Sequence, residues 1–159
     1  MRKLLLRLTI GAALLGSVVV AQDETPSVVW GRRFEAAIQS EFPGAQLQPR
    51  RLPRRDREDY RVWVYEDSEI SVGFTVSESD GEAERQLAER TMMLPAGSAP
   101  VRGFGDQAFI IQPGATVQRR MNLRRHHIVL EISAPGEMAR SRLALALVAA
   151  IDDAELGRP

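Results

Sequence analysis

The chain has no cysteine, one lysine (Lys3) and only two histidines among its 159 residues. The missing cysteine excludes disulfides, thiol nucleophiles, thiolate metal sites and the lipid-bearing cysteine of a lipoprotein. The sequence also has no apolar run long enough to cross a membrane. The apolar stretch of residues 8–20 has 13 residues, whereas a membrane-spanning helix needs about 20.

That stretch belongs to the opening segment "MRKLLLRLTIGAALLGSVVVAQDE". Arg2, Lys3 and Arg7 precede the apolar stretch, and small residues around Ala21 precede an acidic start. This three-part layout is typical of a secretory signal peptide. We therefore expect residues 1–21 to be a signal peptide that is cleaved after Ala21, with an uncleaved anchor as the alternative. The protein is then periplasmic or secreted.

The remaining chain, residues 22–159, has 138 residues, the length of a single domain, and we expect a flexible leader over about 22–26. It carries 18 arginines against 21 acidic residues, a net charge of −3. This balance gives no reason to expect nucleic acid as a partner. The exclusive use of arginine has two explanations, a GC-rich genome or bidentate recognition of phosphate and carboxylate groups.

The first half of the domain shows two helical patterns around a hairpin. Apolar spacing predicts a helix over 27–41 that ends at Pro43-Gly44. Residues 45–59 contain two prolines and predict a connection with at most a short edge strand. Strict alternation within 60–77 predicts two antiparallel strands joined by a turn at 66–68. Ser79 with Glu82 forms the pattern of a capping box, which predicts a second helix over 80–93.

The second half predicts three strands and a helix. The loop 95–105 is rich in Gly, Pro and Ala and is expected to be irregular. The segments "DQAFIIQ", "ATVQRRM" and "HHIVLEIS" follow as strands, with residues 122–125 connecting the last two. Pro135-Gly136 opens a final helix that ends near Asp153.

The order αββαβββα, with short links, predicts an α+β fold. We expect a two-layer sandwich in which an antiparallel sheet of about five strands is covered by helices on one face. The other face of the sheet then meets water.

His126 and His127 are the two histidines of the sequence, so any catalysis or metal binding by histidine requires one of them. Neighbouring residues of a strand point to opposite faces, so the pair is not expected to chelate one metal ion. No HExxH spacing or GxSxG elbow is present. We therefore predict no metal site, no cofactor and no catalytic residue.

Two further motifs have structural interpretations. The acidic pairs at 58–59 and 152–153 lie in a link and at a helix end, where solvated side chains are expected. "GFGD" at 103–106 precedes a strand and is not a dinucleotide-binding loop. Its glycines predict a tight bend with positive φ, at which Asp106 hydrogen-bonds its own backbone.

Two arginine-rich segments form a candidate anionic-ligand site. The loop "RRLPRRDRED" has a net charge of +2, and the predicted hairpin end near residue 122 has a net charge of +3. If the two adjoin, the joint patch attracts an anionic lipid, glycan or protein surface. The candidate residues are Arg50, Arg51, Arg54, Arg55, Arg119, Arg120, Arg124 and Arg125.

The segment "VRGFGDQAFIIQPGATVQRRMNLRRHHIVLEISAP", with the Ala/Leu-rich helix after it, resembles the C-terminal half of small exported bacterial domains, including sensor-like lipoproteins of actinobacteria. Those domains share the loop matched here by residues 103–106 and Ala108, and a strand arginine matched by Arg119 or Arg120. This chain departs from them in lacking the lipid-bearing cysteine and in having "MNLRRHH" in place of a short glycine-asparagine turn. The resemblance implies a compact α+β fold used for binding or sensing.

Three hypotheses for function follow. The first is an exported, non-enzymatic domain that binds another macromolecule, an unknown protein or an envelope component, because strong fold signals occur without a convergent catalytic set. The second is a binder of anionic lipid or glycan surfaces through the arginine-rich segments. The third is a small hydrolase with a spatially assembled site.

Overall fold

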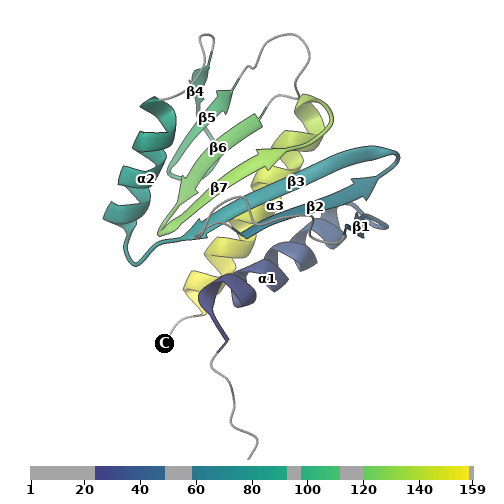
Figure 1. Cartoon of the computed structure of the whole chain (residues 1–159), viewed down its shortest axis with the longest axis horizontal. Coiled ribbons are helices and arrows are strands. Elements are labelled where there is room, and N and C mark those ends of the chain that lie inside the picture. The colour runs from purple at the N-terminus through teal and green to yellow at the C-terminus, as the bar shows by residue number, and fades with distance from the viewer. Residues whose placement is uncertain (1–23, 49–58, 93–97, 112–119, 158–159) are drawn as a thin grey trace, which may run out of the picture.

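The computed structural model describes residues 24–48, 59–92, 98–111 and 120–157. Within these residues the chain forms three helices and one antiparallel sheet of seven strands in the order β1-β2-β3-β7-β6-β5-β4 (Figure 1). The signal peptide predicted for residues 1–21 lies outside them. The elements are α1 (Pro26–Glu41), β1 (Gln46–Leu47), β2 (Asp59–Tyr65), β3 (Ser68–Val76), α2 (Asp80–Met92), β4 (Ala99–Val101), β5 (Gln107–Ile111), β6 (Arg120–Arg125), β7 (Ile128–Ser133) and α3 (Gly136–Leu156).

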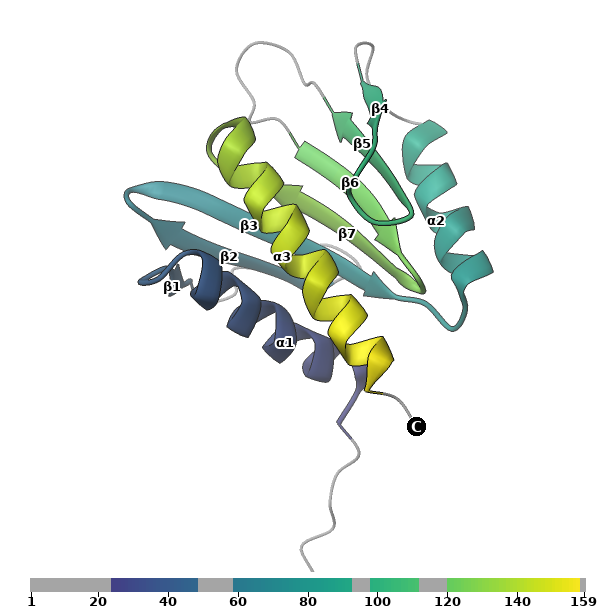
Figure 2. The same cartoon turned by 180° about the vertical axis from the view of Figure 1, so that it is seen from behind.

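The main core lies between the sheet and the helices α1 and α3, which pack against each other on one face (Figure 2). Phe34 of α1 meets Phe74 of β3 edge-on, with 5.1 Å between the ring centroids. The same face of the sheet presents Leu130 and Ile132, and α3 covers it with Leu143 and Leu147, all fully buried. The predicted α+β class is therefore confirmed.

The prediction that the helices share one face is wrong, because α2 packs on the opposite face. Val129 lies between Ile128 and Leu130 in β7, so its side chain points away from the main core. It forms a second buried cluster with Ala83 and Leu87 of α2. Three successive apolar residues in β7 thus mark a strand that is covered on both faces.

Two short strands form the edges of the sheet: β1, which lies where the sequence allowed a short edge strand, and β4, which was not predicted. β1 pairs with β2, and β4 pairs with β5. β1 has two residues and β4 has three, including Pro100, so neither leaves a periodic pattern in the sequence. β4 falls in the segment that was expected to be irregular.

The last hairpin turns at residues 126–127, later along the chain than the predicted connection at 122–125. β6 runs through 122–125, the residues expected to form the connection, and His126-His127 is the two-residue turn between the paired Arg125 and Ile128. Met121, Asn122 and Leu123 are all buried, as expected for a strand covered on both faces. His126 adopts a φ of +50°, which the turn requires.

The β2–β3 turn also holds two residues in the left-handed region. Glu66 has a φ of +48° and Asp67 a φ of +60°, the pair of positive values that a type I′ hairpin turn needs. Asp67→Gly is expected to raise the free energy of unfolding by about 0.5 kcal/mol, because glycine adopts this conformation without steric cost.

Urea denaturation measures the change. The control Ser68→Gly lies in β3, where glycine weakens a strand, and is expected to lower stability by about 0.5–1 kcal/mol. A lower midpoint for Asp67→Gly would contradict the assigned turn.

Candidate functional site

Asp106 fastens the GFGD bend to the β6–β7 turn. Gly103 and Gly105 have φ values of +87° and +67°, as predicted for the bend, and a Cβ on Gly105 would collide with the carbonyl oxygen of Arg124. The carboxylate of Asp106 accepts a hydrogen bond from the backbone N–H of His126 at 2.8 Å. The backbone partner of this carboxylate is therefore in the neighbouring hairpin, whereas the sequence placed it in the loop of Asp106 itself.

The arginines of this hairpin are paired with carboxylates. Arg125 Nη1 donates to Asp106 Oδ1 at 2.8 Å, and its Nε donates to Asp152 Oδ1 of α3 at 2.6 Å. Arg120 Nη1 donates to Glu131 Oε1 on the adjacent strand at 2.9 Å. Asp152 was expected to be a solvated helix-end residue, and it is instead part of this network.

The arginine candidates therefore divide into two groups. Arg124, whose Nη1 lies 3.2 Å from Asp106 Oδ2, completes the set of paired arginines. Three arginines and the carboxylates of Asp106, Glu131 and Asp152 balance to zero charge. The +3 expected from the sequence also counted Arg119, which lies outside the described residues, and it did not count Asp106 and Asp152. An anionic-ligand role for the other five stays a prediction outside the described residues: Arg50, Arg51, Arg54, Arg55 and Arg119.

The two histidines of the turn face the C-terminal part of α3. His126 Nε2 lies 3.5 Å from Asp152 Oδ1, and His127 Nδ1 lies 3.9 Å from Glu155 Oε1. The His127 ring also meets Trp30 of α1 edge-on, at 6.2 Å between centroids. These contacts join the hairpin turn to both helices of the main core.

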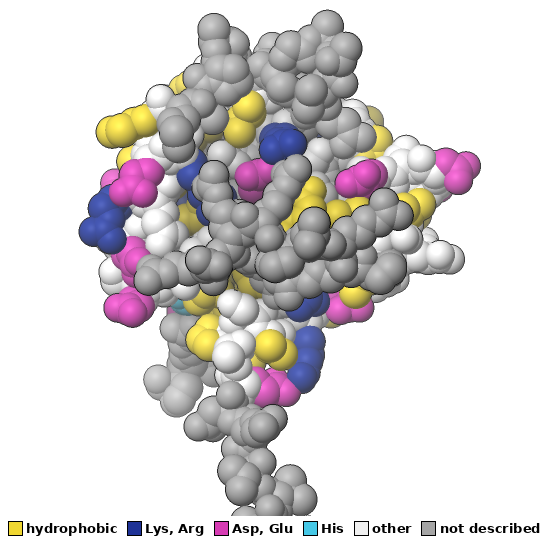
Figure 3. All heavy atoms as spheres, in the orientation of Figure 1, with side chains coloured by type: hydrophobic (Ala, Val, Ile, Leu, Met, Phe, Trp, Pro, Cys, Tyr) yellow, Lys and Arg dark blue, Asp and Glu magenta, His cyan; other side chains and the backbone are white. Residues whose placement is uncertain are grey.

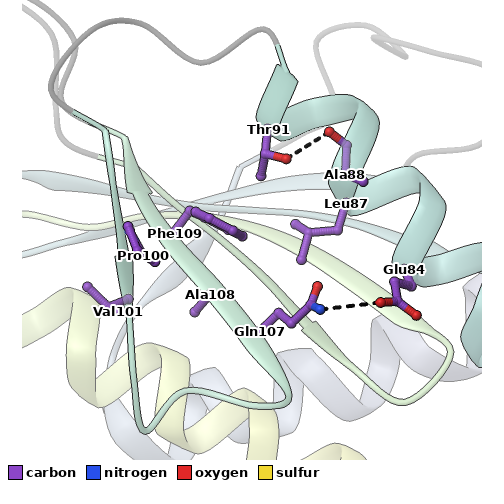
Figure 4. Close-up of a pocket in the computed structure, with 9 residues that line it drawn as sticks. All are labelled: Glu84, Leu87, Ala88, Thr91, Pro100, Val101, Gln107, Ala108 and Phe109. Atoms are coloured by element: carbon purple, nitrogen blue, oxygen red, sulfur yellow. Dashed lines mark hydrogen bonds between the residues drawn. The ribbon is translucent and has the colours of Figure 1, made fainter.

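A hollow of about 370 Å³ opens between α2 and the strands β4 and β5 (Figure 4). Its volume lies in the range typical of ligand sites, about 300–1,000 Å³. Buried Leu87 and partly buried Phe109 contribute its apolar surface. We call it the α2–β5 groove; its lining residues are Glu84, Leu87, Ala88, Thr91, Pro100, Val101, Gln107, Ala108 and Phe109.

Local contacts fix α2 along the far side of this groove. Ser79 Oγ accepts the backbone N–H of Glu82 at 3.2 Å, which confirms the predicted cap. Ser77 Oγ donates to Gln86 Oε1 at 3.1 Å, and Arg90 Nη2 donates to Thr75 Oγ1 at 3.1 Å. These bonds join one flank of α2 to β3 and to the residue that follows it, and the groove lies along the other flank of the helix.

The groove was not predicted from the sequence, because its residues come from a predicted helix, an expected irregular loop and a predicted strand. Nothing in the sequence indicated that these three segments lie together. A signal was nevertheless present in β5, where Ala108 and Phe109 are successive apolar residues. Phe109 lies on the face away from the main core and packs against the α2 cluster. Apolar residues on both faces of a strand indicate a second covering layer.

No protein-family model, curated protein or solved structure matches the chain. The described residues contain no group of three or more His, Asp or Glu side chains placed to hold a metal ion. None of the helices in the described ranges has the length and hydropathy of a membrane span.

The contribution of Asp106 to the free energy of unfolding depends on pH, and the direction follows from its pKa. Partial burial alone would raise the pKa of Asp106, but the hydrogen bonds from the His126 backbone and Arg125, with the charges of Arg124 and Arg125, lower it below its ordinary value of 3.8. A carboxylate whose pKa falls on folding stabilises the protein above that value. This contribution is lost as the pH falls through the folded-state pKa.

Asp106→Asn is expected to lower the free energy of unfolding at pH 7 by about 1–2 kcal/mol, because two arginines lose a charged partner at a partly exposed site. The difference from wild type is expected to shrink below about pH 4. Thermal unfolding across pH, with exposed Asp153→Asn as the control, measures both effects. Equal stabilities of the two variants at pH 7 would contradict this account.

Proposed function

We propose that residues 22–159 form an exported, non-enzymatic domain that binds another macromolecule of the cell envelope or its surroundings through the α2–β5 groove. The observation that supports this most directly is the groove itself, an open hollow with an apolar wall on the surface of the second face of the sheet. An exposed apolar hollow on a folded domain is typical of a binding site.

The distribution of charge favours the groove over the arginine-rich hairpin. Arg120, Arg124 and Arg125 each lie within 3.2 Å of a carboxylate oxygen, so an anionic ligand would have to compete with these internal partners. Over α2, acidic and basic side chains are interspersed (Figure 3). This mixed surface offers no single-sign field to attract an anionic membrane.

The sheet edges support recognition by side chains rather than by strand addition. β1 has only two residues, and β4 contains Pro100, which lacks a backbone N–H. Short edge strands and proline are the features that block pairing with a strand of another chain. A partner segment in the groove therefore makes its contacts with α2 and the faces of β4 and β5.

Ala88→Arg tests the proposal, because Ala88 is exposed, lines the groove and makes no core contact. The larger side chain is expected to fill the groove and to weaken binding of the purified protein to the envelope fraction of its own organism by tenfold or more. Ala149→Arg is the matched control, an exposed alanine on α3 across the sheet. Its binding is expected to equal that of wild type.

Equal binding by both variants, with unchanged thermal unfolding, would overturn the proposal. Protein-free vesicles of anionic phospholipid form a separate arm. Binding to these vesicles that is insensitive to Ala88→Arg and falls steeply with salt would assign the function to the arginine-rich segments instead.

A further inference from the structure

The α2–β5 groove carries a single charged residue. Of its nine lining residues only Glu84 is ionisable, and the other eight are apolar or neutral. The neighbouring arginines of α2 do not line the groove: Arg85 is exposed, and Arg90 donates to Thr75 on the other flank of the helix. The groove therefore combines an apolar wall with one carboxylate.

No arginine of the described residues forms an ion pair with the carboxylate of Glu84. Within the described part of the chain its hydrogen bond comes from Gln107 Nε2, a neutral donor at 3.5 Å, the outer limit for such a bond. Asp106, Glu131 and Asp152, in contrast, each lie within 3 Å of an arginine nitrogen. Glu84 is thus an acid beside the groove that remains available to a cation.

The charge lies at one end of the groove. Figure 4 shows Glu84 and Gln107 together at this end, with Leu87, Phe109 and Pro100 further along. A ligand that lies along the groove therefore contacts the carboxylate at one end and the apolar side chains along the rest of its length. Phe109 presents an aromatic ring for further packing, which favours apolar or aromatic ligand groups.

We propose that the groove binds a basic, apolar peptide segment of a partner protein, an inference that rests on the proposed function. A lysine or arginine of that segment pairs with Glu84, and an adjacent aromatic or aliphatic side chain packs on Leu87 and Phe109. The groove and such a segment are complementary in charge and polarity, because an acidic end and an apolar wall fit a positive charge beside an apolar group. An acidic segment would instead place two like charges together.

Three blocked pentapeptides test this inference, each with two phenylalanines flanking a central lysine, norleucine or glutamate. Their affinities for the purified protein are measured by NMR titration of the amides of α2 and β5. The lysine peptide is expected to bind about fivefold more tightly than the norleucine peptide, the effect of one partly exposed ion pair. The glutamate peptide is expected to bind most weakly.

Glu84→Gln is expected to remove the preference for lysine and to leave the norleucine affinity unchanged. Glu89→Gln is the control, an exposed acid on the same helix that does not line the groove, and it is expected to keep the preference. Ala88→Arg is expected to abolish binding of all three peptides.

Equal affinities of wild type for lysine and norleucine, or a lysine preference that survives Glu84→Gln, would overturn the inference. Failure of all three peptides to bind would overturn it as well. The proposed function is tested separately. If Ala88→Arg abolishes binding to the envelope fraction, the proposed function is supported even when the peptides show no preference for lysine.

Discussion

The strand β7 must be covered on both faces, and the rest of the structure follows from this constraint. Ile128 and Leu130 are fully buried in the main core, while Val129 between them is fully buried by α2. Burying a side chain of this size stabilises a fold by about 1.5–3 kcal/mol. The helices therefore cannot share one face. Because α2 is a single helix on a wide sheet, it leaves open the flank toward β4 and β5 where the groove lies.

Charged residues connect the β6–β7 hairpin to the loop before β5 and to α3. Asp106 joins the loop before β5 to the β6–β7 turn, and Asp152 joins that hairpin to α3 through Arg125. Arginine suits such positions because its planar guanidinium donates to several acceptors at once. The same pairing leaves Glu84 as the acid that the groove offers to a ligand. Internal ion pairs and the proposed recognition site thus use different carboxylates.

Periodicity was sufficient to predict the long elements, and it failed where elements are short or contacts are long-range. The alternation in β3 and the cap at Ser79 are local patterns, so the hairpin and α2 were predictable. β4 was not, because three residues with Pro100 show no period. The face covered by α2 depends on Val129, a contact about 40 residues away along the chain. The groove, which needs both α2 and β5 in place, was out of reach for the same reason.

Amide line broadening tests the central claim most directly, that the α2–β5 groove is the surface used for binding. Isotope-labelled protein is mixed with a substoichiometric amount of the solubilised envelope fraction, and broadening is mapped onto the sequence. The account predicts broadening confined to residues 84–91 and 99–109. Broadening confined to the outer surfaces of α1 and α3, with these two ranges unaffected, would contradict it.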